Sequence, residues 1–321
     1  MKILNLIFFL TITLVKADDL CVYDKILDTD GIPICPHRKS DKQGYLEDPW
    51  ALMRCGYKQS KTYEEPNDNQ KLNMRNYIIA LKSKDPVQIL DSITKTDLRV
   101  CRIKKPNDPI LLSVVKPGVS DFTGGFLLFR ENQDNSNLFI QTLHDTTDYT
   151  HSAPKIGFMK SKAFALLSNG APKNIAIQKS SSDRSRKISD TPHSTQNLVW
   201  IQHKAITTLY PDSVVIHIHG MKGDGIIATN GLGASAEEGS LMRKFGSVIT
   251  NVFKDKDPQF KSRLRSCSGG SGLSIQKNCK LNSAWEQVKD LSKSGRVIGF
   301  ETGMNIMKND FFINLFTGLE V

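Results

Sequence analysis

From about residue 107 onward, the chain alternates short runs of apolar, β-branched residues with longer segments whose apolar residues recur every three or four positions. Short runs of this kind are typical of buried strands, and the longer period is typical of amphipathic helices. Strands are predicted at 110–115, 125–130, 138–143, 174–179, 213–219, 225–229 and 296–301, and helices at 155–168, 194–209 and 236–253. This alternation predicts an α/β fold, with a mixed, mostly parallel central sheet that carries helices on both faces.

Two further features refine this prediction. The polar turn over 131–137 separates two strand candidates, and it predicts a β-hairpin of 125–130 with 138–143. A final apolar segment at 304–316 closes the chain.

The N-terminal end of the chain has a different pattern. Lys2 precedes a short apolar run, and Val15-Lys16-Ala17 places small residues where signal peptidases cleave. Residues 1–17 are therefore predicted to be a signal peptide, and no later segment is apolar for long enough to cross a bilayer. We expect a secreted, extracellular or lumenal protein that makes no membrane contact.

The cysteines fit such an oxidising compartment, because their number is even and none forms a CxxC pair. Cys267 and Cys279 bracket a stretch of serine and glycine, which predicts that they pair with one another. The other four then pair among themselves, in any of three connectivities: Cys21, Cys35, Cys55 and Cys101.

The cysteine positions also suggest how the mature chain is organised. Residues 18–106 are expected to form a disulfide-bearing N-terminal elaboration, and residues 107–321 the catalytic domain. Within the first region, short helices are predicted around 47–54 and 86–93, and an exposed loop at 62–70.

The formal net charge is +10, and the basic residues are scattered along the chain. A solvated basic surface is the simplest interpretation, and attraction to an anionic substrate such as an acidic peptide or a cell-wall polymer is the sharper alternative. No basic motif interleaved with aromatic residues is visible, so nucleic acid is the less favoured partner. A monomer is expected.

The stretch Val214–Gly220 carries the strongest signal for chemistry. It reads VVIHIHG, so a β-branched strand ends in His219 and a glycine, as in many α/β enzymes that present a metal ligand. His144 and Asp148 follow another strand candidate with the spacing His-x-x-x-Asp. These three residues predict a catalytic Zn²⁺ site with a fourth position open to water. Asp145 is an alternative oxygen ligand, and the spacing alone would equally suit a polar turn.

Three further side chains could complete such a site. His217 projects from the same face as His219, so it is either a substrate-facing group, a support for the metal ligand or a hydrogen-bonded core histidine. Asp190 and His193 precede a predicted helix. A helix cap would account for Asp190 but not for His193, so the pair could instead bind substrate or hydrogen-bond a metal ligand.

Glu301 follows the apolar strand 296–300. A carboxylate in this position is costly unless it is paired or functional, and an exposed strand-end glutamate is the alternative. Beside a metal site, Glu301 would act as general base, taking a proton from water and passing it to the leaving amine.

Together these residues resemble the site of the zinc carboxypeptidase-like group with the phosphorylase/hydrolase-like fold, including N-formylglutamate amidohydrolases and poly-γ-glutamate hydrolases. The resemblance covers about residues 110–321 and implies that His144, Asp148 and His219 bind zinc and that Glu301 is the base. This chain departs from the group by having Asp in place of the more usual Glu as first carboxylate, and its N-terminal region has no counterpart there.

The family's substrate-binding Asn-Arg pair is also missing, and the loop residues Arg184 and Arg186 stand in for it. The function expected from these features is a secreted zinc-dependent hydrolase that cleaves an amide bond in a peptide, a γ-glutamyl polymer or a cell-wall fragment. Two alternatives stay open: a non-enzymatic secreted binding protein on the same fold, and a metal-dependent nuclease or phosphoesterase.

Overall fold

The computed structural model describes most of the chain from residue 27 onward. The described residues are 27–35, 37–40, 44–47, 63, 65–103, 107–115, 125–132, 136–144, 153–169, 173–181, 184–221, 226–229, 241–253, 264–266, 274–275, 296–303 and 309–319. The predicted signal peptide over 1–17 and the ligand candidates Asp145 and Asp148 lie outside these ranges. So does the helix predicted around 47–54, except for Glu47, which ends a short strand.

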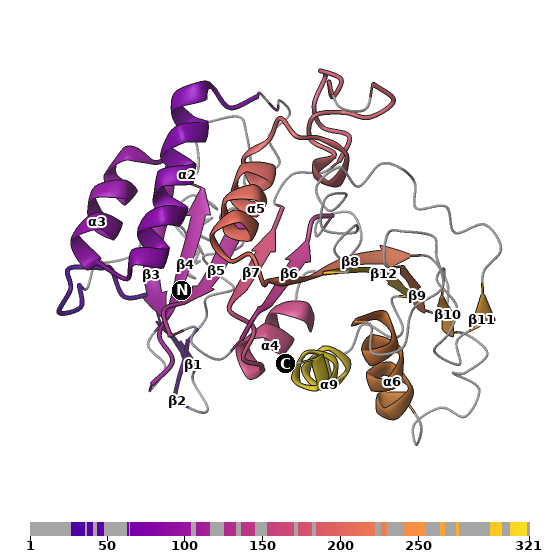
Figure 1. The fold of residues 1–321 in the computed structure, drawn as a ribbon. Helices are drawn as coiled ribbons and strands as arrows, with labels where there is room; N and C mark the ends of the chain where they lie inside the picture. Colours follow the sequence, from indigo (N-terminus) through magenta and orange to yellow (C-terminus); the bar gives the residue numbers. More distant parts are fainter. Residues whose placement is uncertain are drawn as a thin grey trace, which may run out of the picture.

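A mixed ten-stranded sheet forms the centre of the described structure, in the order β11-β10-β9-β12-β8-β6-β7-β5-β4-β3 (Figure 1). Its strands are β3 Leu98–Ile103, β4 Ile110–Val115, β5 Phe126–Arg130, β6 Leu138–Thr142, β7 Ala165–Ser168, β8 Val214–Met221, β9 Ile226–Thr229, β10 Leu264–Ser266, β11 Ser274–Ile275 and β12 Val297–Gly303. A separate small sheet pairs β1 (His37–Ser40) with β2 (Gly44–Glu47).

Four parallel strands, β7, β6, β8 and β12, occupy the middle of the large sheet. On one side, β5, β4 and β3 continue it with antiparallel pairings. On the other, β9 pairs antiparallel with β12, and β10 and β11 follow parallel to β9. The carboxyl ends of the four central strands therefore share one edge, which is where open α/β sheets place their ligand sites.

Helices cover both faces of the sheet, which confirms the predicted α/β class (Figure 1). One layer contains α2 (Asp68–Ser83), α3 (Pro86–Lys95) and α5 (Leu198–Leu209), and the other contains α4 (Ala153–Lys160), α6 (Leu241–Phe253) and α9 (Asn309–Leu319). The alternation of side chains along β8 assigns each residue to a layer. Val215 belongs to the core under α2 and α5, while Ile216 and Ile218 belong to the core over α4, α6 and α9.

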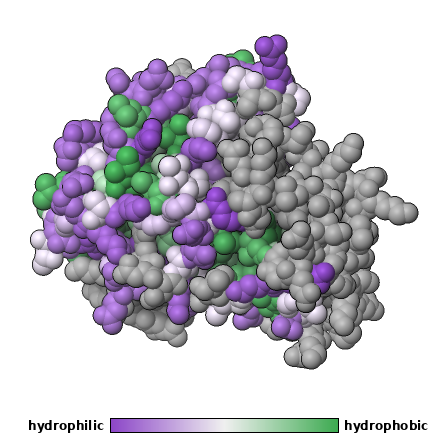
Figure 2. Space-filling model, viewed as in Figure 1, coloured by the Kyte–Doolittle hydropathy of each residue, from purple (hydrophilic) through white to green (hydrophobic). Residues whose placement is uncertain are grey.

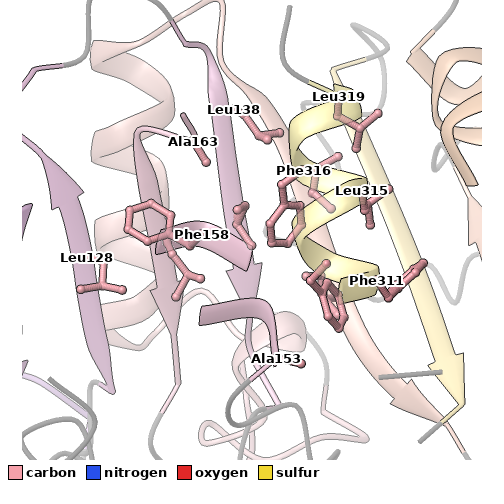
Figure 3. Packing of buried hydrophobic residues seen from close by; sticks show 14 of the residues in the cluster. Leu128, Leu138, Ala153, Phe158, Ala163, Phe311, Leu315, Phe316 and Leu319 are labelled. Carbon is pink, nitrogen blue, oxygen red and sulfur yellow. The ribbon is translucent and has the colours of Figure 1, made fainter. Parts of the chain in front are cut away.

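The second core is rich in phenylalanine, and Figure 3 shows Phe158 of α4 on the side of the strands, with Phe311 and Phe316 on α9. The two helices approach closely at Gly157, where an added Cβ would lie 2.8 Å from the Phe312 Cβ and from the Phe316 ring. Phe158, Phe312 and Phe316 are fully buried, and each such side chain contributes roughly 1.5–3 kcal/mol by leaving water. This packing fixes α4, the helix that connects β6 to β7.

The N-terminal region is joined to the sheet rather than set apart from it. Its strand β3 pairs with β4, and its helices α2 and α3 contribute to the core under α5. Cys35 and Cys101 form a disulfide, one of the pairings left open by the sequence. Beside it, the Arg102 guanidinium binds the carboxylates of Asp28, Asp30 and Glu131, and so fastens the segment 27–35 to β3. The remaining cysteines lie outside the described ranges.

The predicted hairpin of 125–130 with 138–143 is wrong, because β7 lies between β5 and β6. All five residues of β6 are buried, which is typical of a central parallel strand and not of one arm of a hairpin. The chain instead passes from β6 through α4 to the parallel strand β7, as parallel pairs require.

Three other boundaries differ from prediction. The helix expected over 155–168 ends at Lys160, where the Arg130 guanidinium binds the carbonyls of Phe158 and Ser161, and 165–168 form β7. The segment 174–179 is a loop with a single bridge at Lys179. The loop expected at 62–70 gives way to α2 at Asp68.

The start of α2 carries a sequence signal that explains its position. Asn67 and Gln70 form a reciprocal capping box, with hydrogen bonds of 3.0 Å and 2.9 Å between each side chain and the other residue's backbone. The helix predicted around 86–93 is confirmed as α3. No helix in the described parts of the chain combines the length and the apolarity of a membrane span.

Candidate active site

The centre of the candidate site is the carboxyl-terminal half of β8. His217 and His219 project from the same face as Val215, toward the layer of α2 and α5, and both are buried. The strand does not end at His219, as the sequence suggested, because it continues to Met221 and Gly220 pairs with Thr302 of β12. His219 is therefore held by sheet pairing on both sides of it in the chain.

His144 lies two residues after the end of β6 and contacts two groups of the candidate site. Its Nε2–H donates to Asp190 Oδ1 at 2.7 Å, and its Nδ1 lies 3.1 Å from His219 Nδ1. The ring centroids of the two histidines are 4.8 Å apart, with an edge-to-face angle of 70°. The structure thus brings together the two histidines that the sequence proposed as metal ligands.

Asp190 reaches His144 through the loop that follows β7. The segment that carries it stands above the arrowheads of β6 and β7 in Figure 1. The Thr191 hydroxyl donates to the Leu143 carbonyl at 3.0 Å, which ties this loop to the end of β6 beside His144. Asp190 precedes the short 3₁₀ helix η2 (Thr191–His193), but its side chain makes no capping hydrogen bond. The cap interpretation is therefore wrong for Asp190, whose carboxylate is used by His144.

The charge state of Asp190 follows from its surroundings. Burial by itself raises the pKa of this carboxyl group, but the hydrogen bond from His144 and positive charge on His144, His193 and Arg186 together lower the pKa below its usual value. Arg186 Nη1 lies 3.6 Å from Asp190 Oδ2, and His193 Nε2 lies 4.0 Å from Asp190 Oδ1. When His144 is neutral, as a metal ligand must be, a buried and ionised Asp190 fixes its Nε2–H tautomer and leaves Nδ1 as the electron-pair donor.

His217 is the deepest imidazole of the site. It is fully buried and stacks on His219, with ring centroids 4.5 Å apart and an angle of 28°. Burial, followed by the charges of the neighbouring histidines, holds the pKa of His217 well below its ordinary value. His217 therefore stays neutral behind His219, and a substrate would meet His219 first.

A second buried pair extends this polar cluster toward α5. Gln141 lies beside His217 in the parallel register of β6 and β8, and its amide nitrogen is 2.6 Å from His203 Nδ1 of α5. Both side chains are buried. Sequence reasoning missed this pair, and it also missed Thr191. His203 falls on the inner face of its helix, a position where an apolar residue is the usual expectation.

Glu301 lies on β12, directly beside His219 in the parallel register. Because in-register neighbours of parallel strands project from the same face, the Glu301 and His219 side chains share the site face. Glu301 is half-buried and lies inside β12, which runs on to Gly303, so the predicted strand-end position is wrong. Arg184 is exposed in the loop before Asp190, while Arg186 is half-buried.

The two Nδ1 atoms of His144 and His219 suit a zinc ligand pair. Zinc–nitrogen bonds are about 2.0–2.1 Å, so donors separated by 3.1 Å can bind one ion from two sides. The hydrogen bond from His144 to Asp190 has the carboxylate–histidine arrangement common behind zinc ligands. Within the described residues, no group of three or more metal-binding side chains is assembled, and Asp148 lies outside them. Of the three ligands expected from the sequence, the described residues thus bring together the two histidines.

The chain resembles several solved structures in overall path. A candidate metallopeptidase from Shewanella denitrificans aligns with 76% of this chain and 88% of its own, at 11% identity and a TM-score of 0.35. A candidate carboxypeptidase A from the same species aligns with 74% of this chain and 68% of its own, at 7% identity and a TM-score of 0.36. A candidate metallopeptidase from Shewanella amazonensis aligns with 80% of this chain and 96% of its own, at 11% identity and a TM-score of 0.33.

No protein-family model matches the chain, and no curated protein is significantly similar to it. TM-scores below 0.4 describe a loose likeness of chain path, and the site residues gain no support from them.

Proposed function

We propose that this protein is a secreted zinc-dependent hydrolase of amide bonds. The observation that carries the proposal is the 3.1 Å separation of His144 Nδ1 and His219 Nδ1, together with the hydrogen bond from His144 to Asp190. These two histidines would hold zinc, with Asp148 as the third ligand. When bound, zinc would polarise the scissile carbonyl as a Lewis acid.

Asp190 orients His144 in this proposal. Its carboxylate accepts the Nε2–H of His144, and this bond holds the Nδ1 electron pair toward His219. The hydroxyl of Thr191 donates to the Leu143 carbonyl. This hydrogen bond ties the residue after Asp190 to the residue before His144, and so holds the carboxylate beside the imidazole. His217 supports His219 by stacking on it.

Glu301 is the proposed general base, because it is the carboxylate beside His219 on the site face. It accepts a proton from the attacking water, whose oxygen forms a bond to the carbonyl carbon of the substrate. The carbon–nitrogen bond then breaks, and Glu301 returns the proton to the leaving amine. Its half-buried position next to the buried His219 allows contact with both water and substrate.

The substrate proposed is a peptide, a γ-glutamyl polymer or a cell-wall fragment with anionic groups. Arg186 extends from Asp190 toward solvent, with its side chain 40% exposed, and Arg184 lies exposed in the same loop. These guanidinium groups suit carboxylates of a substrate, which they bind through paired hydrogen bonds. His193 follows Asp190 in the same segment, with its ring centroid 6.3 Å from that of His144, and it would contact a bound substrate beside that ring.

The proposal is tested by hydrolysis assays on the purified mature protein. Acidic peptides, poly-γ-glutamate and peptidoglycan fragments would be compared with neutral peptides and with nucleic acid, before and after chelation. Chelation should abolish amide hydrolysis, and added Zn²⁺ should restore it. Cleavage of nucleic acid but of no amide would establish the phosphoesterase alternative instead, and turnover that survives complete chelation would contradict the proposal.

A further inference from the structure

The loop after β7 includes a two-stranded ribbon over residues 177–188 (the basic ribbon), which leads into the candidate site. A bridge pairs Lys179 with Lys187, and the Ser180 N–H donates to the Arg186 carbonyl at 2.9 Å. Figure 2 shows hydrophilic surface at the top of the view, where this ribbon stands in Figure 1. The ribbon is thus an ordered element of the loop that faces solvent.

The basic ribbon concentrates positive charge. Its sequence contains four basic residues and a single acidic one. Arg184 is exposed, and Lys179 is exposed opposite Lys187, although like charges that face one another across paired strands oppose the pairing. Arg186 Nη1 lies 3.6 Å from Asp190 Oδ2, so the cations extend from solvent to the candidate site. Such a ribbon needs support from outside itself to hold these cations in place.

Hydrogen bonds from a neighbouring segment hold the first arm of the ribbon. The Ser180 hydroxyl donates to the His193 carbonyl at 3.2 Å, and the Ser181 N–H donates to Gln196 Oε1 at 2.5 Å. Gln196 directly precedes Asn197, whose side chain caps α5. Gln196 therefore offers the ribbon an acceptor that is fixed to the start of a packed helix.

The amide nitrogen of Gln196 binds the N-terminal region. Gln196 Nε2 donates to Glu65 Oε2 at 2.9 Å, and Glu65 Oε1 accepts from Lys71 Nζ at 2.7 Å. Lys71 lies in the first turn of α2, whose inner face belongs to the core that it shares with α5. A carboxylate only accepts and a backbone N–H only donates, so Glu65 and Ser181 together fix the orientation of the amide between them. The segment before α2 thus reaches the ribbon through one glutamine.

We infer that Gln196 is a positioning residue, through which the N-terminal region holds the basic ribbon, and with it Arg184 and Arg186, beside the candidate site. The inference rests on the proposed function, because these guanidinium groups are the proposed partners of substrate carboxylates. It gives the N-terminal region a role in substrate binding in addition to folding. A ribbon that is ordered in advance reduces the entropy lost when an anionic substrate binds, so loosening it should raise KM and leave kcat nearly unchanged.

Limited trypsin digestion of the full mature chain tests the support of the ribbon, with mass spectrometry to identify cleavage after Arg184, Arg186 or Lys187. Gln196→Ala should speed cleavage there by about fivefold or more, because local opening becomes easier when the hydrogen bonds that oppose it are lost. The control Gln88→Ala makes the same change at an exposed position of α3, and it should alter the rate by less than about twofold. Circular dichroism would establish that each variant is folded, and equal cleavage rates in wild type and Gln196→Ala would overturn the inference.

An exchange of side chains between Glu65 and Gln196 tests the contact itself. Gln196→Glu alone places two carboxylates against one another, and it should loosen the ribbon as Gln196→Ala does. Adding Glu65→Gln should return cleavage to within about twofold of wild type, because the new amide donates to the new carboxylate, which still accepts the Ser181 N–H. A double variant as easily cleaved as Gln196→Glu would show that the two side chains do not act through their contact, and would also overturn the inference.

Acidic peptides test the consequence for substrate binding. Gln196→Ala should raise the KM for a Glu-rich peptide by about fivefold with kcat within about twofold, and should leave the KM unchanged for the same peptide with Gln in place of Glu. Anisotropy of fluorescein-labelled hexaglutamate measures the same loss as a Kd, without turnover. Faster trypsin cleavage with unchanged KM and Kd would overturn the role in substrate binding. A wild-type chain that binds hexaglutamate more tightly than Gln196→Ala, but hydrolyses no amide, would support the inference and contradict the proposed hydrolase alone.

Discussion

The Nδ1 atoms of His144 and His219 lie 3.1 Å apart, although 75 positions separate the two residues in the chain. The contact exists because β6 and β8 are parallel neighbours, so the loop after β6 and the last residues of β8 meet at the same edge of the sheet. Asp190 holds the opposite side of the His144 ring at 2.7 Å. A carboxylate, two imidazoles and the adjacent Glu301 therefore converge from four separate segments.

Replacing Asp190 by Asn should weaken zinc binding without unfolding the protein. The amide can no longer fix the His144 tautomer as a carboxylate does, and losses of this kind typically cost about 10–100-fold in metal affinity. Competition with a chromophoric chelator measures the Kd for zinc. Asp212→Asn, an exposed change in the turn after α5, provides the matched control and should leave the Kd unchanged. Equal zinc affinity in Asp190→Asn and wild type would remove Asp190 from the site.

Glu301→Gln should keep bound zinc and lose activity. The side chain keeps its shape beside His219 but cannot accept a proton, and general acid–base catalysis typically contributes about 10²–10⁴-fold. The kcat on the best amide substrate, measured with metal content in the same samples, decides the role. Full turnover with unchanged metal would mean that another group is the base, and His193 would be the next candidate.

Stability should fall as the pH falls below about 6.5, partly because of His217. The pKa of His217 is depressed in the folded protein, so only the unfolded chain takes up this proton as the pH falls through the ordinary value. The stabilising contribution is thus present above the unfolded pKa and is lost below it, with a slope of at most about 1.4 kcal/mol per pH unit for one proton.

Urea unfolding of wild type and His217→Gln between pH 5 and pH 7.5 measures this slope. The glutamine does not titrate, so the variant should show a shallower dependence on pH even if it is less stable overall. Parallel curves for the two proteins would show that His217 titrates normally in the folded state.

The Cys35–Cys101 disulfide should contribute strongly to stability, because it closes a loop of 66 residues and holds the segment 27–35 on β3. Replacing both cysteines by Ser should lower the free energy of unfolding by about 2–5 kcal/mol. Urea unfolding under oxidising conditions measures the change, and reducing agent should then have less effect on the variant than on wild type. The predicted Cys267–Cys279 pair would be sought by peptide mapping in the same preparations.

Much of the fold was predictable from the sequence, because buried strands and amphipathic helices have different periods. The strand at β8 and the helices α5 and α6 were located in this way, within a few residues of their ends. Strand order was not predictable, because it depends on contacts between distant segments. The hairpin prediction failed for this reason: a polar turn indicates that the chain reverses, but not that β7 will lie between the two strands.

The candidate site was predictable to a similar extent. Residue type and strand position identified His144 and His219, and the sheet brings them into contact. The sequence left two roles open for Asp190, a helix cap and a hydrogen bond to substrate or to a metal ligand, because a carboxylate before a short helix usually caps it. Its use by His144 depends on a loop held by Thr191 and Ser189, whose hydrogen bonds to backbone at 143 and 173 no local pattern encodes.

The metal content of the purified mature protein tests the central proposal most directly. Inductively coupled plasma mass spectrometry should find about one zinc per chain in wild type and far less in His219→Ala. His203→Ala is the matched control, because it removes another buried imidazole, bound to Gln141 rather than to His144, and it should keep the zinc. Wild-type protein that binds no zinc after incubation with the metal, or His219→Ala protein that binds as much as wild type, would contradict the proposed zinc site.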